Sequence, residues 1–272
     1  MEYTSSDKQL PRGRVKLSAV IRAAGDIIHI DDAARTLDLS RTEAAKLLSR
    51  WAKQGWLRRV GSGAYVPVPL DSLESAHVLE DPWVLVPALF SPAYIGGRTA
   101  AEHWDLTEQI FRDIVVMTAQ TVRAKVQQRH GAHFILKHIR KEKIFGMKTV
   151  WRGRTKISVS DIHRTMIDML DDPALGGGIQ HVADCLNAYF QRPDHDFEKL
   201  IAYGDRLGNG AVFKRLGFLA ERNPKGEPLI APCRTHRTKG NAKLDPALHC
   251  PRLISRWRLW VPESWARGGG RD

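Results

Sequence analysis

Six polar side chains recur on one face of the segment that follows Ser40, and their chemistry suits binding of nucleic acid. They are Arg41, Thr42, Lys46, Ser49, Arg50 and Lys53. The spacing of three and four residues places such side chains together on an α-helix. Lysine and arginine bind phosphates and guanine edges, and small hydroxyl side chains bond to several bases. The face is therefore predicted to bind double-stranded DNA.

A capped helix is expected to carry this face. Ser40 is a favourable N-cap and Glu43 completes a capping box, so the recognition helix is predicted to start here, with Ser40 at its DNA-binding end. Its other face is apolar at helical spacing: Ala44, Leu47, Leu48 and Trp51. We expect that face to pack on two preceding helices, one over residues 17–24 and one opened by Asp31. Their contributing residues are Val20, Ile21, Ile27, Ala33, Ala34 and Leu37.

A two-stranded ribbon is predicted after this helix, with Gly55 ending the helix. Strand-forming residues flank Gly61-Ser62-Gly63, and glycine allows a tight turn there. Arg58, Arg59 and Ser62 form the predicted wing contacts to DNA phosphates. The order of helices and ribbon predicts a winged helix-turn-helix over residues 1–70. The alternative is a winged helix used only for contacts with proteins.

Composition favours an anionic partner. The chain has 272 residues, 43% of them hydrophobic, and a formal net charge of +12. This length suits two domains, and the charge favours nucleic acid. No apolar run approaches the roughly 20 residues that span a bilayer, and the first residues lack the apolar stretch of a signal peptide. A cytoplasmic location without membrane contact, and reduced cysteines, are therefore expected.

The rest of the chain predicts an α+β protein, in which a larger mixed α/β C-terminal domain follows the winged helix. A linker is expected at residues 71–80, the second domain at 81–265 and a disordered tail at 266–272. Strands are predicted at 110–120, 133–146 and 148–160, and a final one at 252–265. Helices are predicted at 94–104, after a Ser160 cap, and at 179–190, 196–207 and 211–222.

Residues 119–156 are strongly basic, with Glu142 as the sole acid. Interleaved with strands, they could present a basic sheet surface to phosphates. The candidate phosphate contacts are Lys137, Arg140, Lys141, Lys143, Arg152 and Arg154. A solvated charged face is the equally simple alternative.

Catalytic and metal chemistry is not indicated. Asp161, His163 and Asp168 could suggest acid–base or metal chemistry, but an N-terminal carboxylate and an intrahelical ion pair with Arg164 explain them better. Cys233, His236, His249 and Cys250 match no common zinc spacing. A nuclease would need a carboxylate cluster at a strand end, which the strands lack. We therefore expect no enzyme, no cofactor and no metal.

The order of segments resembles the AbiEi-type antitoxin and transcriptional regulator family of type IV toxin–antitoxin systems. The resemblance follows PAYIGGRTAAEHWDLTEQI, IVVMT, ISVSDIHRTMIDMLDDP, AVFKRLGFLAE and LDPALHCPRLISRWRLWVP, and covers residues 15–262. Most matching positions are interpreted as holding the fold. They are Ser160, Asp161, Arg164, Thr165, Asp168, Arg215, Leu216, Gly217, Asp245 and Pro246.

The resemblance implies a winged helix that binds inverted repeats in its own promoter, represses its operon, and is joined to an AbiEi-like C-terminal antitoxin domain. It also implies a nucleotidyltransferase-like toxin as a functional partner, without a stable complex. Two alternatives stay open. One is a standalone transcription factor without a toxin, and the other is an antitoxin that acts through its C-terminal domain on the toxin or on RNA.

Overall fold

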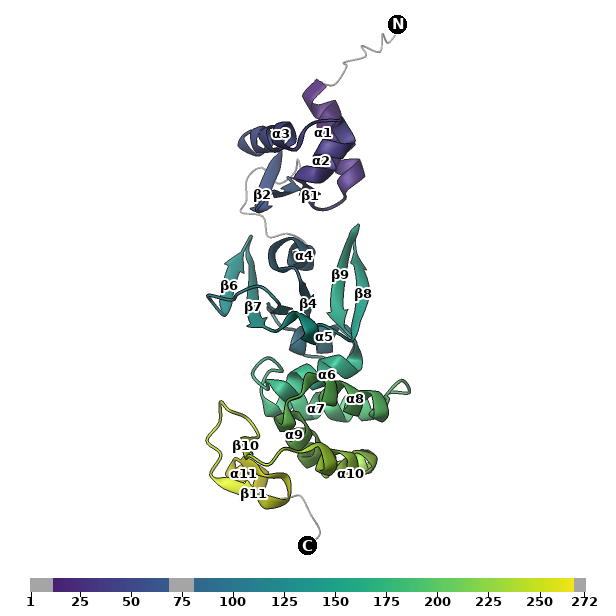
Figure 1. The fold of residues 1–272 in the computed structure, drawn as a ribbon, viewed down its shortest axis with the longest axis vertical. Coiled ribbons are helices and arrows are strands. Elements are labelled where there is room, and N and C mark those ends of the chain that lie inside the picture. Colours follow the sequence, from purple (N-terminus) through teal and green to yellow (C-terminus); the bar gives the residue numbers. More distant parts are fainter. Residues whose placement is uncertain (1–11, 69–80, 267–272) are drawn as a thin grey trace, which may run out of the picture. The chain divides into compact units, whose positions relative to one another are not determined.

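The computed structural model describes residues 12–68 and 81–266 (Figure 1). Its contacts divide the chain into two compact units. The first contains the chain up to Leu89 and the two turns Arg129–Gly131 and Trp151–Ile157, and the second contains the remainder. Both helices and sheets occur throughout, so the expected α+β class is confirmed. The predicted linker at 71–80 lies outside the described residues, as does the predicted tail beyond Ala266, which ends helix α11 (Glu263–Ala266).

Three helices form the core of the first unit: α1 (Arg12–Ala24), α2 (Ile30–Leu37) and α3 (Arg41–Lys53). The predicted apolar face of α3 is confirmed, since Leu48 and Trp51 are buried in one cluster with Val20 and Ala33. Ile27 is buried but does not belong to that cluster. Its neighbour Ile28 belongs to the cluster instead.

The capping box that opens α3 is confirmed. The Ser40 hydroxyl accepts from the backbone N–H of Glu43 at 3.2 Å, and the Glu43 carboxylate accepts from the backbone N–H of Ser40 at 3.0 Å. The hydroxyl and amide bonds from Ser40 lower the pKa of Glu43. Gly55 follows the helix with φ +76°, a backbone geometry that favours glycine. Local chemistry thus fixes both ends of α3.

A three-stranded sheet follows, one strand more than the predicted ribbon. Its order is β1 (Ile28–His29), β3 (Ala64–Pro67), β2 (Leu57–Gly61), with antiparallel pairing throughout. The two-residue strand β1 was missed because so short a segment carries no alternating pattern. The turn between β2 and β3 places Gly63 at φ +70°, which a side chain would strain.

The larger sheet has six strands in the order β6-β7-β5-β4-β9-β8. Their bounds are β4 Ala93–Ile95, β5 Asp113–Thr118, β6 Val126–Arg129, β7 Ala132–His138, β8 Met147–Arg152 and β9 Thr155–Ser160. Strand β5 pairs parallel with β7 and antiparallel with β4, and β4 pairs parallel with β9. The predicted strand at 110–120 is confirmed in outline, whereas the predicted strand at 148–160 is two strands, β8 and β9, joined by a turn at Gly153.

Two further sequence predictions around this sheet need correction. The predicted helix 94–104 is a strand at Tyr94 followed by helix α5 (Gly97–His103), because β4 is recruited by pairing with β5 and β9. The predicted strand 133–146 stops at His138, and a short turn, η3 (Lys141–Lys143), follows. Before the sheet, residues 82–90 form η2 (Pro82–Val84) and α4 (Leu85–Phe90).

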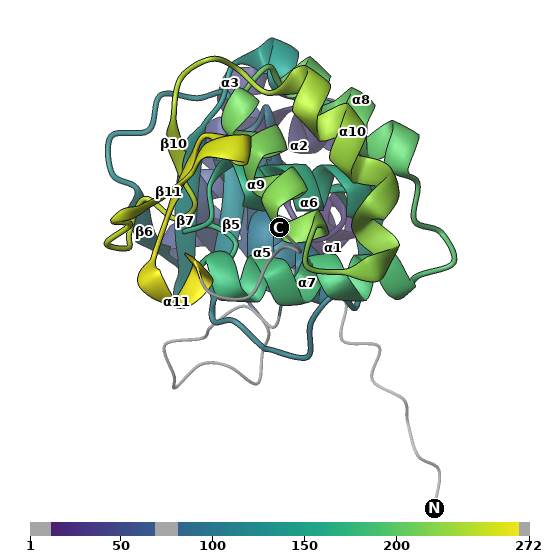
Figure 2. The ribbon, with the colours of Figure 1, turned by 90° about the horizontal axis from the view of Figure 1, so that it is seen from below.

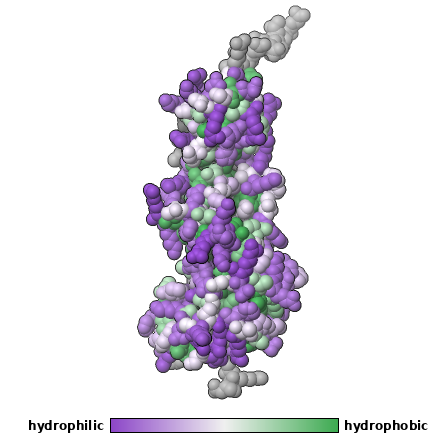
Figure 3. Space-filling view, viewed as in Figure 1, coloured by the Kyte–Doolittle hydropathy of each residue, from purple (hydrophilic) through white to green (hydrophobic). Residues whose placement is uncertain are grey.

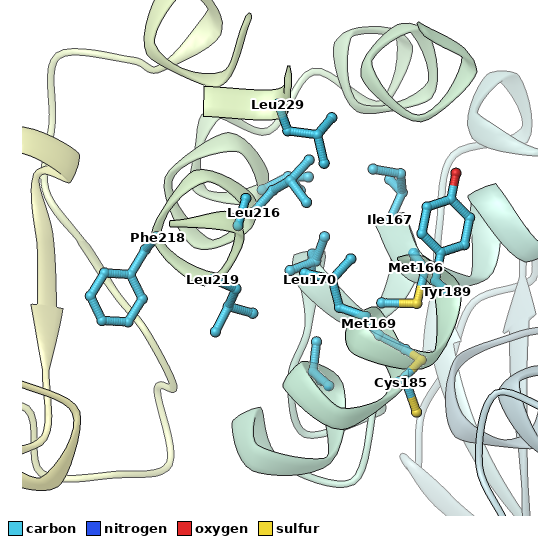
Figure 4. Packing of buried hydrophobic residues seen from close by; sticks show 14 of the residues in the cluster. Met166, Ile167, Met169, Leu170, Cys185, Tyr189, Leu216, Phe218, Leu219 and Leu229 are labelled. Atoms are coloured by element: carbon cyan, nitrogen blue, oxygen red, sulfur yellow. The ribbon is translucent and has the colours of Figure 1, made fainter. Parts of the chain in front are cut away.

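Helices α6 (Ile162–Asp171), α7 (Ile179–Gln191), α8 (Phe197–Leu207) and α9 (Gly210–Ala220) confirm the predictions for residues 160–222. Helix α10 (Glu227–His236) follows, which the sequence analysis did not predict. These helices surround the largest core of the second unit (Figures 1 and 2). Figure 4 shows side chains of α6, α7 and α9 meeting in this core, among them Met166, Leu216 and Tyr189. Cys185 and Cys233 are buried in the same cluster as free thiols.

The predicted final strand is instead two short strands. β11 (Arg252–Ile254) and β12 (Leu259–Val261) pair antiparallel, and η5 (Ser255–Trp257) lies between them. Arg258 adopts φ +51°, which reverses the chain direction. β12 also pairs parallel with β10 (Ala242–Lys243). The turn places Trp257 in the core, where its side chain is fully buried.

Gly217 on α9 is expected to tolerate no side chain, because an added Cβ would overlap the buried indole of Trp257. Alanine gains about 1 kcal/mol over glycine in a helix, whereas overpacking a core costs about 1–3 kcal/mol or more. We predict that Gly217→Ala lowers the free energy of unfolding by about 1–2 kcal/mol. Urea unfolding of Gly217→Ala, Trp257→Leu and the double variant measures this. If the losses of stability in the two single variants simply add up in the double variant, the predicted clash with Trp257 is excluded. Residues in contact should instead show non-additive effects.

The described residues contain no helix with the length and apolarity that a bilayer crossing requires. In the view of Figure 3, hydrophilic side chains cover much of the visible face. Large exposed hydrophobic side chains are few among the described residues, with Ile110, Val126 and Trp151 the most exposed. Isolated exposed apolar residues of this kind are normal.

Candidate nucleic-acid interface

Helix α3 presents the predicted polar face to solvent. Thr42, Lys46, Ser49, Arg50 and Lys53 are all exposed, while Ala44, Leu48 and Trp51 on the other side are buried. None of these five exposed side chains forms an ion pair within the described residues, so the three cations are available to a ligand. The backbone behind them is held by the capping box and by the core of the first unit.

Arg41 is engaged at the start of the same helix. Its guanidinium forms an exposed ion pair with Asp31 on α2. Exposed pairs of this kind contribute little stability, about 0–1 kcal/mol. A phosphate could therefore displace Asp31 from Arg41. No local pattern in the sequence predicts this pairing between α2 and α3.

The predicted wing residues lie on β2 and at its turn. Arg59 is exposed, and its Nε donates to the carbonyl of Gly61 at 3.2 Å, which ties the side chain to the turn. Arg58 is half-buried and Ser62 is exposed at the tip. The ribbon is irregular between Arg59 and Gly61, where the register with β3 shifts.

Arg154 serves an internal role in the first unit. Its backbone N–H donates to the Asp26 carboxylate at 2.7 Å, and its guanidinium donates to the carbonyls of Ile21 and Arg22 at the end of α1. Thr155 donates to the same carboxylate at 3.0 Å. The turn of the β8–β9 hairpin thus caps α1. Sequence analysis missed Asp26, since its partners lie about 130 residues away and leave no local signal.

Three further candidate phosphate contacts also have partners. Lys137 lies 2.6 Å from Asp171 and 3.4 Å from Asp172, and although burial alone would lower its pKa, these carboxylates raise it. Lys143 donates to the carbonyl of Arg206 at 2.7 Å. Arg152 lies 3.5 Å from Asp81 and stacks over Trp83.

Arg140 and Lys141 differ from these four candidates, because they are exposed and form no ion pair within the described residues. The six candidates also divide between the units, with Arg152 and Arg154 in the first and the other four in the second. The structure therefore leaves Arg140 and Lys141 as the most accessible phosphate contacts of the set.

The cluster on α6 is built as an internal network. Asp161, and not the predicted Ser160, caps the helix by accepting from the N–H of Arg164 at 2.8 Å, because Ser160 still belongs to β9. Arg164 donates to Asp168 at 2.9 Å and to the hydroxyl of Tyr94 at 2.8 Å. Burial raises the pKa of Asp168, against the opposing charge of Arg164.

Two of the histidines considered in the sequence analysis make internal contacts. His163 bonds to the Tyr189 hydroxyl at 2.9 Å, and burial lowers its pKa. His236 stacks on Phe213 at 4.9 Å. Among residues 12–68 and 81–266, no three His, Cys, Asp or Glu side chains converge in a way that could hold a metal ion.

The positions that carry the family resemblance make structural contacts. Ser160 and Thr165 join their hydroxyls at 2.7 Å. The Arg215 guanidinium donates to the carbonyls of Lys243, Leu244, Leu170 and Asp171. The Asp245 carboxylate accepts from the N–H of Ile179 at 3.0 Å and so caps α7. Their interpretation as fold-holding residues is confirmed for these contacts.

Comparison with known proteins establishes the fold alone. No protein-family model matches the sequence, and no curated protein matches it. The crystal structure of the RV2827C protein from Mycobacterium tuberculosis is similar, with a TM-score of 0.61 and 15% sequence identity. The match covers 94% of this chain and 93% of that chain. The two proteins therefore share a fold across both units of the present chain.

Proposed function

We propose that the chain is a sequence-specific regulator of transcription that binds double-stranded DNA. In this proposal residues 12–68 act as a winged helix-turn-helix, α3 enters the major groove, and the β2–β3 ribbon is the wing. Arg58, Arg59 and Ser62 contact the backbone beside the groove. The protein acts in the cytoplasm and needs no cofactor.

One observation carries the proposal: the solvent-facing side of α3 bears Lys46, Arg50 and Lys53, none of which forms an ion pair among the described residues, while its opposite side is locked into a core. A rigid helix with a cationic, hydroxyl-bearing face has the dimensions and donors that the major groove accepts. The formal charge of +12 adds long-range attraction to a polyanion.

The resemblance to AbiEi-type antitoxins makes the proposal more specific. We propose that the protein binds inverted repeats in its own promoter, represses that operon and counters a nucleotidyltransferase-like toxin. In this arrangement the second unit supplies the antitoxin domain. Support comes from the order of segments across residues 15–262 and from the structural contacts of the matching positions.

The test is binding of the purified protein to a labelled fragment of the DNA upstream of its own gene. We expect a shift at moderate salt that an unrelated duplex does not compete away, and an affinity that falls steeply as salt rises. Absence of any preference for the upstream fragment would refute the regulator. A footprint then locates the operator.

Arg140→Ala combined with Lys141→Ala should weaken binding to every duplex alike. Each phosphate contact contributes about −0.9 to the slope of log affinity against log salt, so losing both contacts reduces that slope by about 1.8. Fluorescence anisotropy at several salt concentrations measures it. Lys239→Ala with Lys243→Ala removes the same charge from other exposed positions. Equal slopes for the two double variants would exclude a specific role for Arg140 and Lys141.

A further inference from the structure

An acidic groove interrupts the basic character of the second unit. It has a volume of about 1020 Å³ and lies between α8 and α10, which pack side by side (Figures 1 and 2). Four carboxylate residues line it, and none of its lining residues is lysine or arginine. They are Asp194, Asp196, Glu198 and Asp205. In a chain with 42 basic and 30 acidic residues, this local excess of negative charge needs an explanation.

Only two of the four acids have a structural role. Asp194 pairs with Arg192 at 2.7 Å, and Asp196 caps α8 by accepting from the N–H of Lys199 at 2.9 Å. Glu198 and Asp205 are exposed and form no hydrogen bond or ion pair through their side chains within the described residues. Two carboxylates on the rim are therefore available to a cationic ligand.

The groove is apolar below this rim. Phe197 and Ile201 are half-buried in its wall, and Leu229 is fully buried beneath it. On α8, Glu198, Ile201 and Asp205 fall at three- and four-residue spacing, so one helical face alternates acid and apolar groups along the groove. Proline residues of α10, at 228 and 232, form much of the opposite wall.

We propose that this groove is the docking site for a lysine- or arginine-bearing amphipathic helix of a partner protein. The line from Glu198 to Asp205 spans seven residues, about 10 Å at 1.5 Å per residue, which matches about two turns of a docked helix. Apolar side chains of that helix occupy the space between Ile201 and Leu229. Its flanking cations pair with Glu198 and Asp205.

The charge distribution selects this occupant over nucleic acid. Phosphates are repelled by four carboxylates and meet no lysine or arginine among the lining residues, whose only other ionisable groups are His195 and His236. Binding of a helix in an apolar groove is a recurrent mode of recognition, with apolar anchors for affinity and rim charges for register. The inference does not depend on DNA binding by α3, and it concerns residues that have no place in that proposal.

The test uses a fluorescein-labelled peptide of about four helical turns, with leucine along one face and lysine on both flanks. Anisotropy titration of the full-length protein should show saturable binding. A peptide with glutamate in place of lysine should not bind. If the lysine peptide fails to bind, or the glutamate peptide binds equally well, the proposal is wrong.

Charge reversal then locates the binding site. Glu198→Lys with Asp205→Lys should raise the Kd for the lysine peptide by about tenfold or more, since like charges are then opposed. Glu108→Lys with Glu142→Lys makes the same change in net charge at other exposed positions of the second unit and should leave the Kd within about twofold. Equal losses in both double variants would overturn the proposal.

Steric block provides an independent check. Ala202 is exposed on the groove face of α8, so Ala202→Trp should fill the groove without entering the core, and should abolish peptide binding. Binding of promoter DNA should remain unchanged in this variant, which separates the two proposals. Sedimentation supplies a last criterion, because it detects self-association of the wild-type protein. If the wild type self-associates and Glu198→Lys with Asp205→Lys abolishes this, the groove binds a second copy of the chain and the proposed partner is rejected.

Discussion

Replacing Lys46 and Arg50 together with alanine should abolish the preference of the protein for its promoter over unrelated DNA. Both side chains are exposed on α3, one turn apart, and neither forms an ion pair among the described residues. A bidentate contact to a base edge contributes about 1–3 kcal/mol of discrimination. Losing two such contacts lowers the ratio of specific to non-specific affinity by about thirtyfold or more. Anisotropy with promoter and scrambled duplexes measures this ratio.

The fold should survive this double substitution. Neither side chain packs in the core cluster of the first unit, and alanine has the highest helix propensity. The melting temperature is therefore expected to stay within a few degrees of the wild-type value. A suitable control is Lys16→Ala with Arg22→Ala, which removes the same charge from exposed positions on α1. The α1 variant should lose affinity for all duplexes equally and keep its preference for the promoter. If the α3 variant also keeps that preference, α3 has no role in recognition.

The sequence predicts α3 well because its determinants are local. Ser40 and Glu43 lie three residues apart, and the apolar face from Ala44 to Trp51 repeats within one helix. The turn between β2 and β3 is likewise contained in Gly61-Ser62-Gly63. Such patterns act on neighbouring residues, and no distant partner is needed to create them.

Elements fixed by distant pairing escape the same reasoning. Tyr94 lies in a segment with helical character, yet its backbone pairs with Met117, and its hydroxyl reaches Asp168. Asp26 receives bonds from Arg154 and Thr155, far along the chain. Neither contact leaves a local signal, because the pairing depends on how the sheet and the helices assemble. The same reason explains why four of six predicted phosphate contacts carry internal bonds.

The acidic groove shows another limit of prediction from sequence. Glu198 and Asp205 read as ordinary exposed residues of an amphipathic helix. Only the packing of α10 against α8 sets the apolar wall opposite them and turns a helix face into a groove. The groove therefore depends on two helices, and the sequence of α8 alone does not show that α10 packs against it.

Arg164→Met should be among the most destabilising single substitutions in the second unit. The Arg164 side chain is fully buried, and it lies over the ring of Phe145 at 4.2 Å while donating to Asp168 and Tyr94. Methionine preserves much of the apolar volume but leaves the Asp168 carboxylate with Tyr94 as its hydrogen-bond donor and with the charge of Lys137 nearby. Removing one member of a buried ion pair costs about 3–5 kcal/mol. Urea unfolding at neutral pH measures the loss.

The loss should depend on pH in a defined direction. Burial already raises the pKa of Asp168 in the wild-type protein, and Arg164 is the strongest influence that lowers it. Without Arg164 the folded-state pKa rises further above the unfolded value of about 3.9, so the folded state binds more protons between these two values. The free energy of unfolding of Arg164→Met should therefore fall as pH rises through this window, and the deficit should shrink on acidification.

Neutralising the partner gives the decisive comparison. In the Arg164→Met background, Asp168→Asn removes the buried charge and keeps a side chain that can bond to Tyr94. We expect the double variant to be more stable at neutral pH than Arg164→Met alone, and its stability to lack the pH dependence of the single variant. If Arg164→Met instead lost stability equally at all pH values, the cost would come from packing around Phe145. The charge of Asp168 would then play no part in holding the sheet strand β4 to helix α6.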